Sequence, residues 1–295
     1  MSGLVPVYRR RGSALHAARA GASASFCLAL AFAPILFDNP IVLGSLLCAV
    51  LAAALGAGVA SDLRRWALYA AGLALLVVIV NPLVTSDGLT VLVRGGSFLD
   101  RRWDITLEAL VYGGVAALRV LDIVLAFALL SVAVDPDELL RSLRRVSDRS
   151  ALTAALTTRL VPVLARDALR KSEAARCRPE PPGRVAVARA AVAGSLERAV
   201  ELAAALEVRG YSRARRPRVA RRPWSRHDLR VMASALAIVV LGVVAKLAGA
   251  GGFQAYPTTH VSAGVAEAAL GIAFVGLAAA PFAGAGGRLG VAARA

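Results

Sequence analysis

The chain has 295 residues, of which 58% are hydrophobic and only 18% are charged, and its mean hydropathy is +0.64. Soluble domains usually carry about 25% charged residues. The composition therefore excludes an ordinary soluble domain and predicts a polytopic membrane protein. The formal net charge of +16 arises from 35 Lys and Arg residues against 19 Asp and Glu residues.

Six apolar stretches have about the 20-residue length that a helix needs to cross a bilayer. They are Ala20–Phe37, Ile41–Ala60, Trp66–Val84, Ile105–Val134, Leu229–Ala250 and Val261–Phe282. We therefore expect an all-α fold, a polytopic membrane helix bundle with about six transmembrane helices. Arg9, Arg10 and Arg11 precede the first stretch, as they would in a signal peptide. A retained membrane helix is favoured, because Asp38-Asn39-Pro40 is a turn signal and no small-x-small cleavage site follows the stretch.

The basic residues are unevenly distributed along the chain. Between Asp135 and Asp228 lie 21 of the Lys and Arg residues against 11 Asp and Glu residues. Because basic loops stay on the cytoplasmic side, this segment is expected there, as are both termini of a multi-pass protein of the cell membrane. The predicted parts are a basic cytoplasmic N-terminus (1–19), an N-terminal bundle of four spans (20–134), a cytoplasmic helical region (135–228), and a C-terminal transmembrane hairpin with its tail (229–295).

An acidic run, Asp135-Pro136-Asp137-Glu138, opens the cytoplasmic region. These acids could ligate a divalent metal, but a helix start explains them better. Asp135 would be the N-cap and Pro136 the first helical residue, with the next two acids near the positive end of the helix dipole. The cysteines and histidines are widely separated, so no metal site and no disulfide framework is predicted.

Two amphipathic helices are predicted in this region. The first runs from about Ala151 to Ala175-Arg176-Cys177, and the second from about Val185 to Val208-Arg209-Gly210, so that their terminal arginines are 33 residues apart. Helical spacing places an apolar stripe on the second helix, formed by Val192, Leu196, Ala199, Val200, Ala203 and Leu206. Gly210 fits a left-handed cap after that helix.

From Arg209 to Arg226 there are eight arginines in 18 residues, together with Tyr211 and Trp224. Arginines interleaved with aromatic residues can bind nucleic acid. In a membrane protein, however, such a segment directly before a span usually sets the topology and contacts anionic lipids. Membrane lipids are therefore the expected partner, and nucleic acid is not.

Five ionisable residues fall within or near the spans: Glu108, Arg119, Asp122, Lys246 and Glu267. Arg119 and Asp122 are three residues apart and are expected to pair on one helix face. Lys246 and Glu108 can reach the nearest interface. Glu267 has no obvious partner in the sequence and is a candidate for contact with another subunit.

Taken in order, these residues resemble the transmembrane (T) component of energy-coupling factor (ECF) transporters, the CbiQ-type family. The resemblance covers roughly residues 20–250 and rests on Asn81-Pro82-Leu83 at the end of a span, on the acidic run at Asp135, and on the two Arg-tipped helices. Family members carry Ala-Arg-Gly signatures on two coupling helices that insert into two ATP-binding-cassette (ABC) subunits. Here Ala175-Arg176-Cys177 departs at the glycine and Val208-Arg209-Gly210 at the alanine.

The resemblance implies a non-catalytic coupling subunit of an ATP-driven importer, with two ABC-type ATPases and a substrate-capturing membrane subunit as partners. The substrate would be a vitamin or a transition-metal ion, and the chain itself would hold no cofactor. The sequence contains no GxxxxGK[ST] loop, so ATP would be hydrolysed by separate subunits.

Other readings remain open. Each arginine could simply favour the negative end of its own helix, which is worth about 0.3–1 kcal/mol. The whole chain could instead be a membrane scaffold or an anionic-lipid-binding protein without ATPase partners, or an enzyme that acts on lipid through the acids near Asp135.

Overall fold

The structure is a computed structural model that describes residues 11–84, 90–98, 101–143, 148–179, 182–209, 224–254, 260–261 and 264–283. The chain forms two compact units. One unit, the bundle, comprises Met1–Leu139 and Trp224–Ala295, and the other comprises Leu140–Pro223. The bundle is described first.

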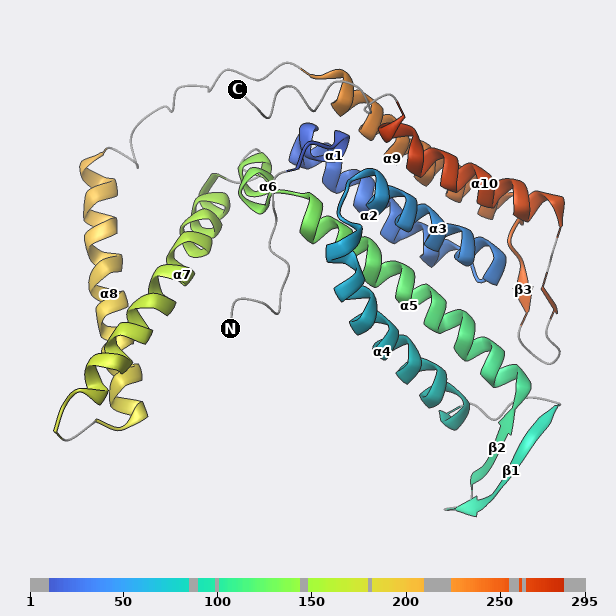
Figure 1. The fold of residues 1–295 in the computed structure, drawn as a ribbon, viewed down its shortest axis with the longest axis horizontal. Coiled ribbons are helices and arrows are strands. Elements are labelled where there is room, and N and C mark those ends of the chain that lie inside the picture. Colours follow the sequence, from blue (N-terminus) through green and yellow to red (C-terminus); the bar gives the residue numbers. More distant parts are fainter. Residues whose placement is uncertain are drawn as a thin grey trace. The chain divides into compact units, whose positions relative to one another are not determined.

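Each of the six predicted spans is a helix, which confirms an all-α membrane bundle (Figure 1). The helices are α2 (Ala20–Leu36), α3 (Pro40–Gly56), α4 (Ala60–Val84), α5 (Leu107–Ala133), α9 (Arg226–Leu247) and α10 (Val265–Ala279), the last followed by the 3-10 turn η1 (Ala280–Phe282). Within the described part of the chain, four stretches are long and apolar enough to cross a membrane, namely α4, α5, α9 and α10 with η1. The other two, α2 and α3, are shorter apolar helices.

The structure adds short elements that the hydrophobic pattern does not predict. An antiparallel hairpin of β1 (Val91–Phe98) and β2 (Arg101–Thr106) occupies the connection between α4 and α5. A second, smaller hairpin of β3 (Phe253–Gln254) and β4 (His260–Val261) lies between α9 and α10. A one-turn helix, α1 (Ala14–Ala17), precedes α2. Helix α4 also begins six residues before the predicted span, so its first turns carry polar residues.

The core of the bundle lies among α2, α3, α5, α9 and α10. Its largest fully buried side chains include Phe26, Leu30, Leu46, Leu129 and Phe274. Phe274 of α10 meets Phe37 edge to face, with 6.0 Å between the ring centroids, a favourable geometry for aromatic pairs. This packing explains why α2 and α3 remain part of the membrane bundle although each has only 17 residues.

Helix α4 lies at the edge of the bundle and packs along α5 (Figure 1). Its other faces expose large apolar side chains, such as Leu68, Leu75 and Ile79. A contiguous apolar surface of this kind is stable in hydrocarbon and not in water. The exposed faces of α4 therefore belong to the lipid-facing surface of the bundle.

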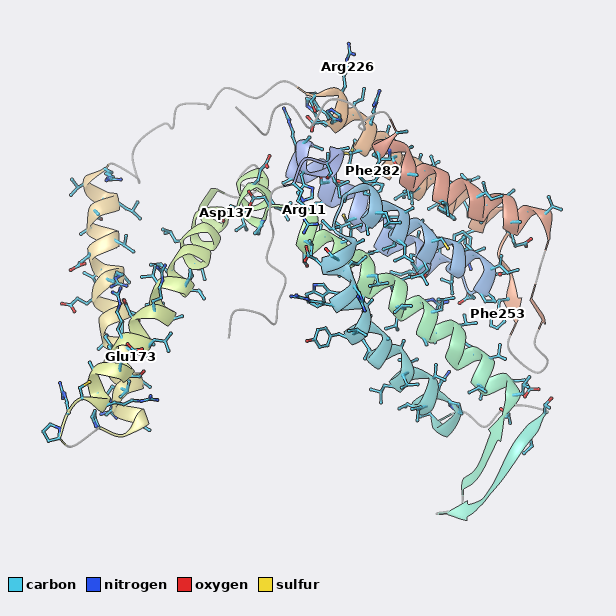
Figure 2. The ribbon with its side chains drawn as sticks, in the orientation of Figure 1. Arg11, Asp137, Glu173, Arg226, Phe253 and Phe282 are labelled. Atoms are coloured by element: carbon cyan, nitrogen blue, oxygen red, sulfur yellow. The ribbon has the colours of Figure 1, made fainter. Side chains whose placement is uncertain are left out.

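The chain segments that were expected on one side of the membrane gather at one end of the bundle. Arg11 pairs with Asp62 near the start of α4, and Arg19 pairs with Asp228 near the start of α9. Val134, at the end of α5, packs against Ala20 of α2. At the other end, the Asn39 side chain donates to the carbonyl of Gly252. Figure 2 shows Arg11 at this same end of the bundle.

Two expectations about ionisable residues are wrong. Arg119 does not pair with Asp122, since its guanidinium donates to the carbonyls of Pro34 and Phe37 and to the carboxylate of Asp38, at 2.5 Å. The end of α2 and the residue after it thus offer the guanidinium three hydrogen-bond acceptors, more than the carboxylate of Asp122 alone would offer. Asp122 is fully buried, and within the described ranges both its carboxylate oxygens lack a hydrogen-bond partner.

The second wrong expectation is that Glu267 lacks a partner, because this residue is buried and caps a helix start; its contact with another subunit stays a prediction. Its carboxylate accepts a hydrogen bond of 2.9 Å from the backbone N–H of Gly264, the N-cap of α10. This satisfies one of the donors that every helix start leaves unpaired. Glu108, at the start of α5, accepts likewise from the backbone N–H of Thr90 at 3.1 Å. Lys246 lies 3.8 Å from the carboxylate of Asp38, which it shares with Arg119.

One glycine is required by the backbone at the turn between α3 and α4. Gly58 has a φ of 69°, in the left-handed region that glycine adopts without steric cost. Its carbonyl accepts a hydrogen bond from Arg11. The turn therefore presents an acceptor to the N-terminal segment and helps to hold Arg11 next to Asp62.

Candidate coupling site

The region between α5 and α9 begins with a capped helix. Helix α6 (Pro136–Leu143) begins at Pro136, and the carboxylate of Asp135 accepts a 2.9 Å hydrogen bond from the N–H of Asp137. The predicted N-cap is therefore confirmed. Among the described residues, no group of three or more His, Cys, Asp and Glu side chains could hold a metal ion.

The second unit contains the two predicted amphipathic helices. Helix α7 spans Asp148–Arg176 and helix α8 spans Arg184–Val208. Both helices stop where the sequence predicts, since Arg176 is the last residue of α7 and Arg209 is the C-cap of α8. Pro179 in the short connection disfavours further helix, and Gly183 is the N-cap of the next one.

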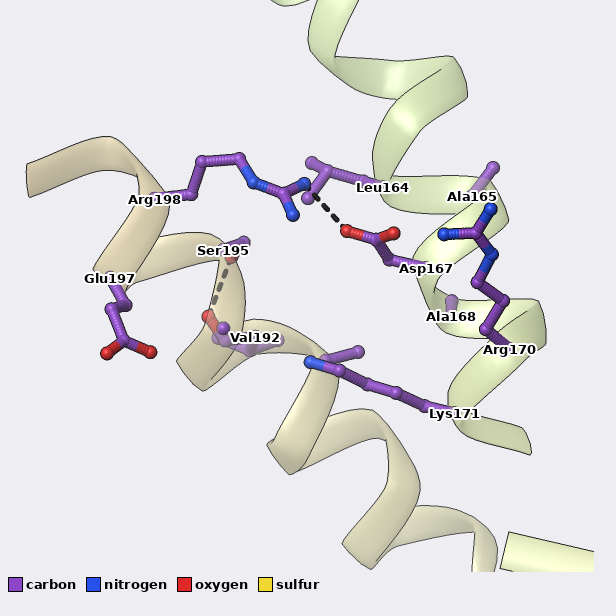
Figure 3. A pocket seen from close by; sticks show the side chains of 12 residues that line it. Leu164, Ala165, Asp167, Ala168, Arg170, Lys171, Val192, Ser195, Glu197 and Arg198 are labelled. Atoms are coloured by element: carbon purple, nitrogen blue, oxygen red, sulfur yellow. Dashed lines mark hydrogen bonds and ion pairs between the residues drawn. The ribbon is translucent and has the colours of Figure 1, made fainter. Parts of the chain in front are cut away.

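Two polar contacts join α7 to α8 as an antiparallel hairpin. Asp167 of α7 and Arg198 of α8 form an ion pair of 2.6 Å. One turn closer to the connection, the ammonium of Lys171 donates to the carbonyl of Ala190 at 2.8 Å. Figure 3 shows both side chains reaching from α7 toward α8. The contacts follow antiparallel order, because the later position on α7 meets the earlier position on α8.

Gly194 allows the close approach of the two helices at this point. A Cβ atom placed on Gly194 would lie 2.5 Å from the ammonium nitrogen of Lys171, so a larger residue would displace that ammonium. Leu164 and Val192 line the same open cleft, which has a volume of about 690 Å³. The helices diverge beyond this crossing toward the far end of α8 (Figure 1).

The sequence analysis missed these contacts between the helices. Asp167 and Arg198 are 31 residues apart, far beyond the three- or four-residue spacing that pairs side chains within one helix. The only sequence signal was that two helices of similar length follow each other across a short break. That signal predicts a hairpin but no particular pair.

The structure places the predicted tip residues as follows. Arg176 and Cys177 are exposed and Ala175 is half-buried, while Val208 is 89% exposed and Arg209 is exposed. Gly210 lies outside the described residues. Within those residues, neither Arg176 nor Arg209 makes an ion pair or a side-chain hydrogen bond. Both guanidiniums are therefore available to another molecule.

The two tips do not lie together. In an antiparallel hairpin the end of α7 adjoins the start of α8, so Arg209 stands at the opposite end of α8 from Arg176. The 25 residues of α8 span about 37 Å at 1.5 Å per residue. The unit therefore presents one arginine near each end of its longer dimension.

The apolar stripe predicted on α8 exists but is left uncovered within its own unit. Val192, Leu196 and Val200 are each about 60% exposed or more. Helical spacing puts all three on one face. Exposed apolar patches of this kind are typical of interaction surfaces.

The arrangement is that of a membrane bundle with a charged helical hairpin inserted before its last two spans. A family model described as CbiQ, cobalt transport protein, matches residues 11–219, more than two thirds of the chain. The chain belongs to this cobalt transport protein family. The match includes the helices α2 to α5 of the bundle and all of α7 and α8.

Membership in the CbiQ family makes the chain a membrane component of a transport system. The family implies a transport complex that contains ATPases and other membrane components. Together with the apolar helices, it identifies a multi-pass membrane protein. Among curated proteins, none matches this chain.

Proposed function

We propose that this CbiQ-family chain is the transmembrane coupling subunit of an ECF-type, ATP-driven importer. In this proposal, Ala175-Arg176-Cys177 docks on one ABC-type ATPase subunit and Val208-Arg209-Gly210 docks on a second. A separate membrane protein captures the substrate. The observation that carries the proposal is that two exposed arginines stand at opposite ends of one hairpin, without an ion pair or side-chain hydrogen bond among the described residues.

The chemistry of the tips suits docking onto protein acceptors. A guanidinium is always charged and presents five N–H donors in a planar fork, which fits carboxylates and backbone carbonyls. At the end of a helix, the guanidinium can reach acceptors inside a groove of a partner protein without steric hindrance from the rest of the helix. Stabilisation of the helix dipole alone would explain each arginine singly. It would not explain why both helix ends carry an exposed arginine and stand at opposite ends of the hairpin.

The separation of the tips supports two docking sites rather than one. A single ATPase groove that receives one helix end has no need of a second end about 37 Å away. Two ATPase subunits that close on ATP would instead move the two ends relative to each other. The contacts Asp167–Arg198 and Lys171 to Ala190 would make α7 and α8 move together as one rigid hairpin. In the chain, α6 precedes this hairpin and α9 follows it, so its movement would pass to the bundle through these two connections.

The substrate is assigned to the capture subunit, not to this chain. The description of the family names cobalt transport, and a vitamin or a transition-metal ion is the class of substrate we propose. Residues of the bundle would carry motion and would not bind the substrate. The orientation we propose puts the hairpin and both termini in the cytoplasm. The segment that contains the hairpin is rich in Lys and Arg, and basic loops stay on the cytoplasmic side.

The test uses the complex co-expressed with its two ATPases and its capture subunit. A double Arg176→Ala, Arg209→Ala variant should lose ATPase subunits on purification and should lose transport-linked ATP hydrolysis. The matched control is Arg189→Ala, which removes an exposed arginine from the side of α8. An assembled complex with unchanged coupled ATPase activity in the double variant would show that the tips do not couple.

A membrane scaffold would behave differently in the same preparation. Detergent-solubilised coupling subunit should carry ABC ATPases with it, whereas a scaffold or lipid-binding protein would purify without them. Loss of the ATPases in the double variant but not in Arg189→Ala would assign their retention to the tips.

A further inference from the structure

A narrow apolar crevice lies between α3, α4 and α5 at the end of the bundle where the N-terminal segment attaches. Its volume is about 320 Å³, and apart from one arginine its lining is apolar, with Leu51, Leu55, Leu63 and Leu125 among the side chains. Leu55 and Leu51 are 70% and 43% exposed. The crevice is therefore open to the surroundings of the bundle and is filled by nothing in the described chain.

Arg64 lines the crevice, and Arg65 follows it on α4. Both arginines are exposed, and within the described residues neither makes an ion pair or a hydrogen bond. The nearest acid in the sequence, Asp62, is already engaged by Arg11 at 2.5 Å. The rim of the crevice therefore carries the positive charge of Arg64, which no group in the described part of the chain neutralises, while Arg65 points from another face of α4.

Aromatic residues mark the depth of this rim in a membrane. Trp66 and Tyr69 follow the arginines on α4 and meet edge to face, with 6.4 Å between the ring centroids. Trp and Tyr are enriched where hydrocarbon meets the headgroups. Leu68, between them, is exposed, and further exposed apolar residues of α4 follow from Leu73 onward. Arg64 and Arg65 therefore stand at headgroup level, and the crevice lies beside the adjoining hydrocarbon.

The geometry points to a binding site for one anionic phospholipid. Its phosphate would pair with Arg64, and one acyl chain would lie in the crevice between α3, α4 and α5. A guanidinium binds phosphate through parallel N–H donors, and the volume suits a single chain at the low end of ligand pockets. A zwitterionic lipid could fill the crevice, but the cation of its headgroup would offset the negative charge that its phosphate offers to Arg64.

The test uses the full chain in phosphatidylcholine vesicles, with Trp103→Phe and Trp224→Phe so that Trp66 alone reports. Brominated phosphatidylglycerol should quench Trp66 at a mole fraction well below that needed for brominated phosphatidylcholine. The preference should fall by about fivefold in Arg64→Gln, because one cation near the surface contributes about one such factor. Arg65→Gln removes an exposed arginine that does not line the crevice and should change the preference less.

Two further variants separate the site from general attraction to the surface. Arg226→Gln removes an exposed arginine from the start of α9 and should leave the preference unchanged. Ala60→Phe, which fills the crevice and keeps both arginines, should weaken quenching by both lipids. Equal quenching by the two lipids in the parent chain would overturn the proposal, as would an equal loss of preference in Arg226→Gln. The outcome does not depend on ATPase partners, so it stands apart from the coupling function.

Discussion

Arg19 and Asp228 are 209 residues apart in the sequence, yet both the backbone and the side chain of Arg19 contact the same carboxylate. The Arg19 N–H donates to Asp228 at 2.7 Å, and the guanidinium lies 3.5 Å from its second oxygen. Asp228 also accepts from the N–H of Ser225, and Arg19 lies over the ring of Trp224 at 5.2 Å. The start of α2 is thereby joined to the point where the chain re-enters the bundle.

Loss of the Asp228 carboxylate should destabilise the bundle more than loss of the Arg19 guanidinium. Asp228→Ala removes the capping of α9 and leaves buried N–H groups unpaired, which costs about 2 kcal/mol or more. Arg19→Ala keeps the backbone donor and should cost about 1 kcal/mol. Thermal unfolding in detergent measures both. Equal midpoints for the two variants would contradict this order.

Two buried carboxyl groups on α5 should respond oppositely to removal. Asp122→Ala should raise the unfolding midpoint, because an unpaired buried polar group costs about 1–3 kcal/mol. Glu108→Ala should lower it, because this carboxylate accepts from the N–H of Thr90. The two single variants serve as controls for each other in one thermal unfolding experiment. A lower midpoint for Asp122→Ala would mean that a partner outside the described residues satisfies this side chain.

The ion pair Asp167–Arg198 should narrow the range of angles between α7 and α8. Spin labels at the exposed positions Leu169 and Val192 report this range as a distance distribution. Asp167→Ala should broaden the distribution, whereas Asp167→Arg combined with Arg198→Asp should restore it. Because both partners are partly exposed, the effect on stability should stay below about 1 kcal/mol. An unchanged distribution in Asp167→Ala would show that packing alone holds the hairpin.

Labelling of Cys177 should show on which side of the membrane the hairpin lies and whether ATPases are bound to it. Its thiol is exposed, whereas Cys27 is buried and Cys48 lines an apolar crevice in the spans. A membrane-impermeant maleimide should therefore modify Cys177 only when the cytoplasmic face is accessible. Bound ATPases should protect Cys177, while a cysteine introduced by Arg189→Cys should stay reactive. Labelling of Cys177 in sealed right-side-out cells would reverse the proposed orientation.

The residue pattern was sufficient to predict the six spans, the cap at Asp135 and the ends of α7 and α8. These are local features, because hydrophobic length and helix-terminal residues act within a few turns of the chain. The β1–β2 and β3–β4 hairpins were not predicted, because their strands are too short to produce a clear alternation of apolar and polar residues in the sequence. Helix α4 began earlier than its apolar stretch, because polar residues continue a helix into the interface.

The pairing of distant charges was decided by tertiary structure alone. Helical spacing suggested Arg119 with Asp122, but the end of α2 places three acceptors around Arg119 and leaves Asp122 buried without a partner in the described part of the chain. Likewise, two Arg-tipped helices were visible in the sequence. Only their antiparallel packing through Asp167 and Arg198 set the tips at opposite ends of α8, because the direction of a helix in space depends on what it packs against.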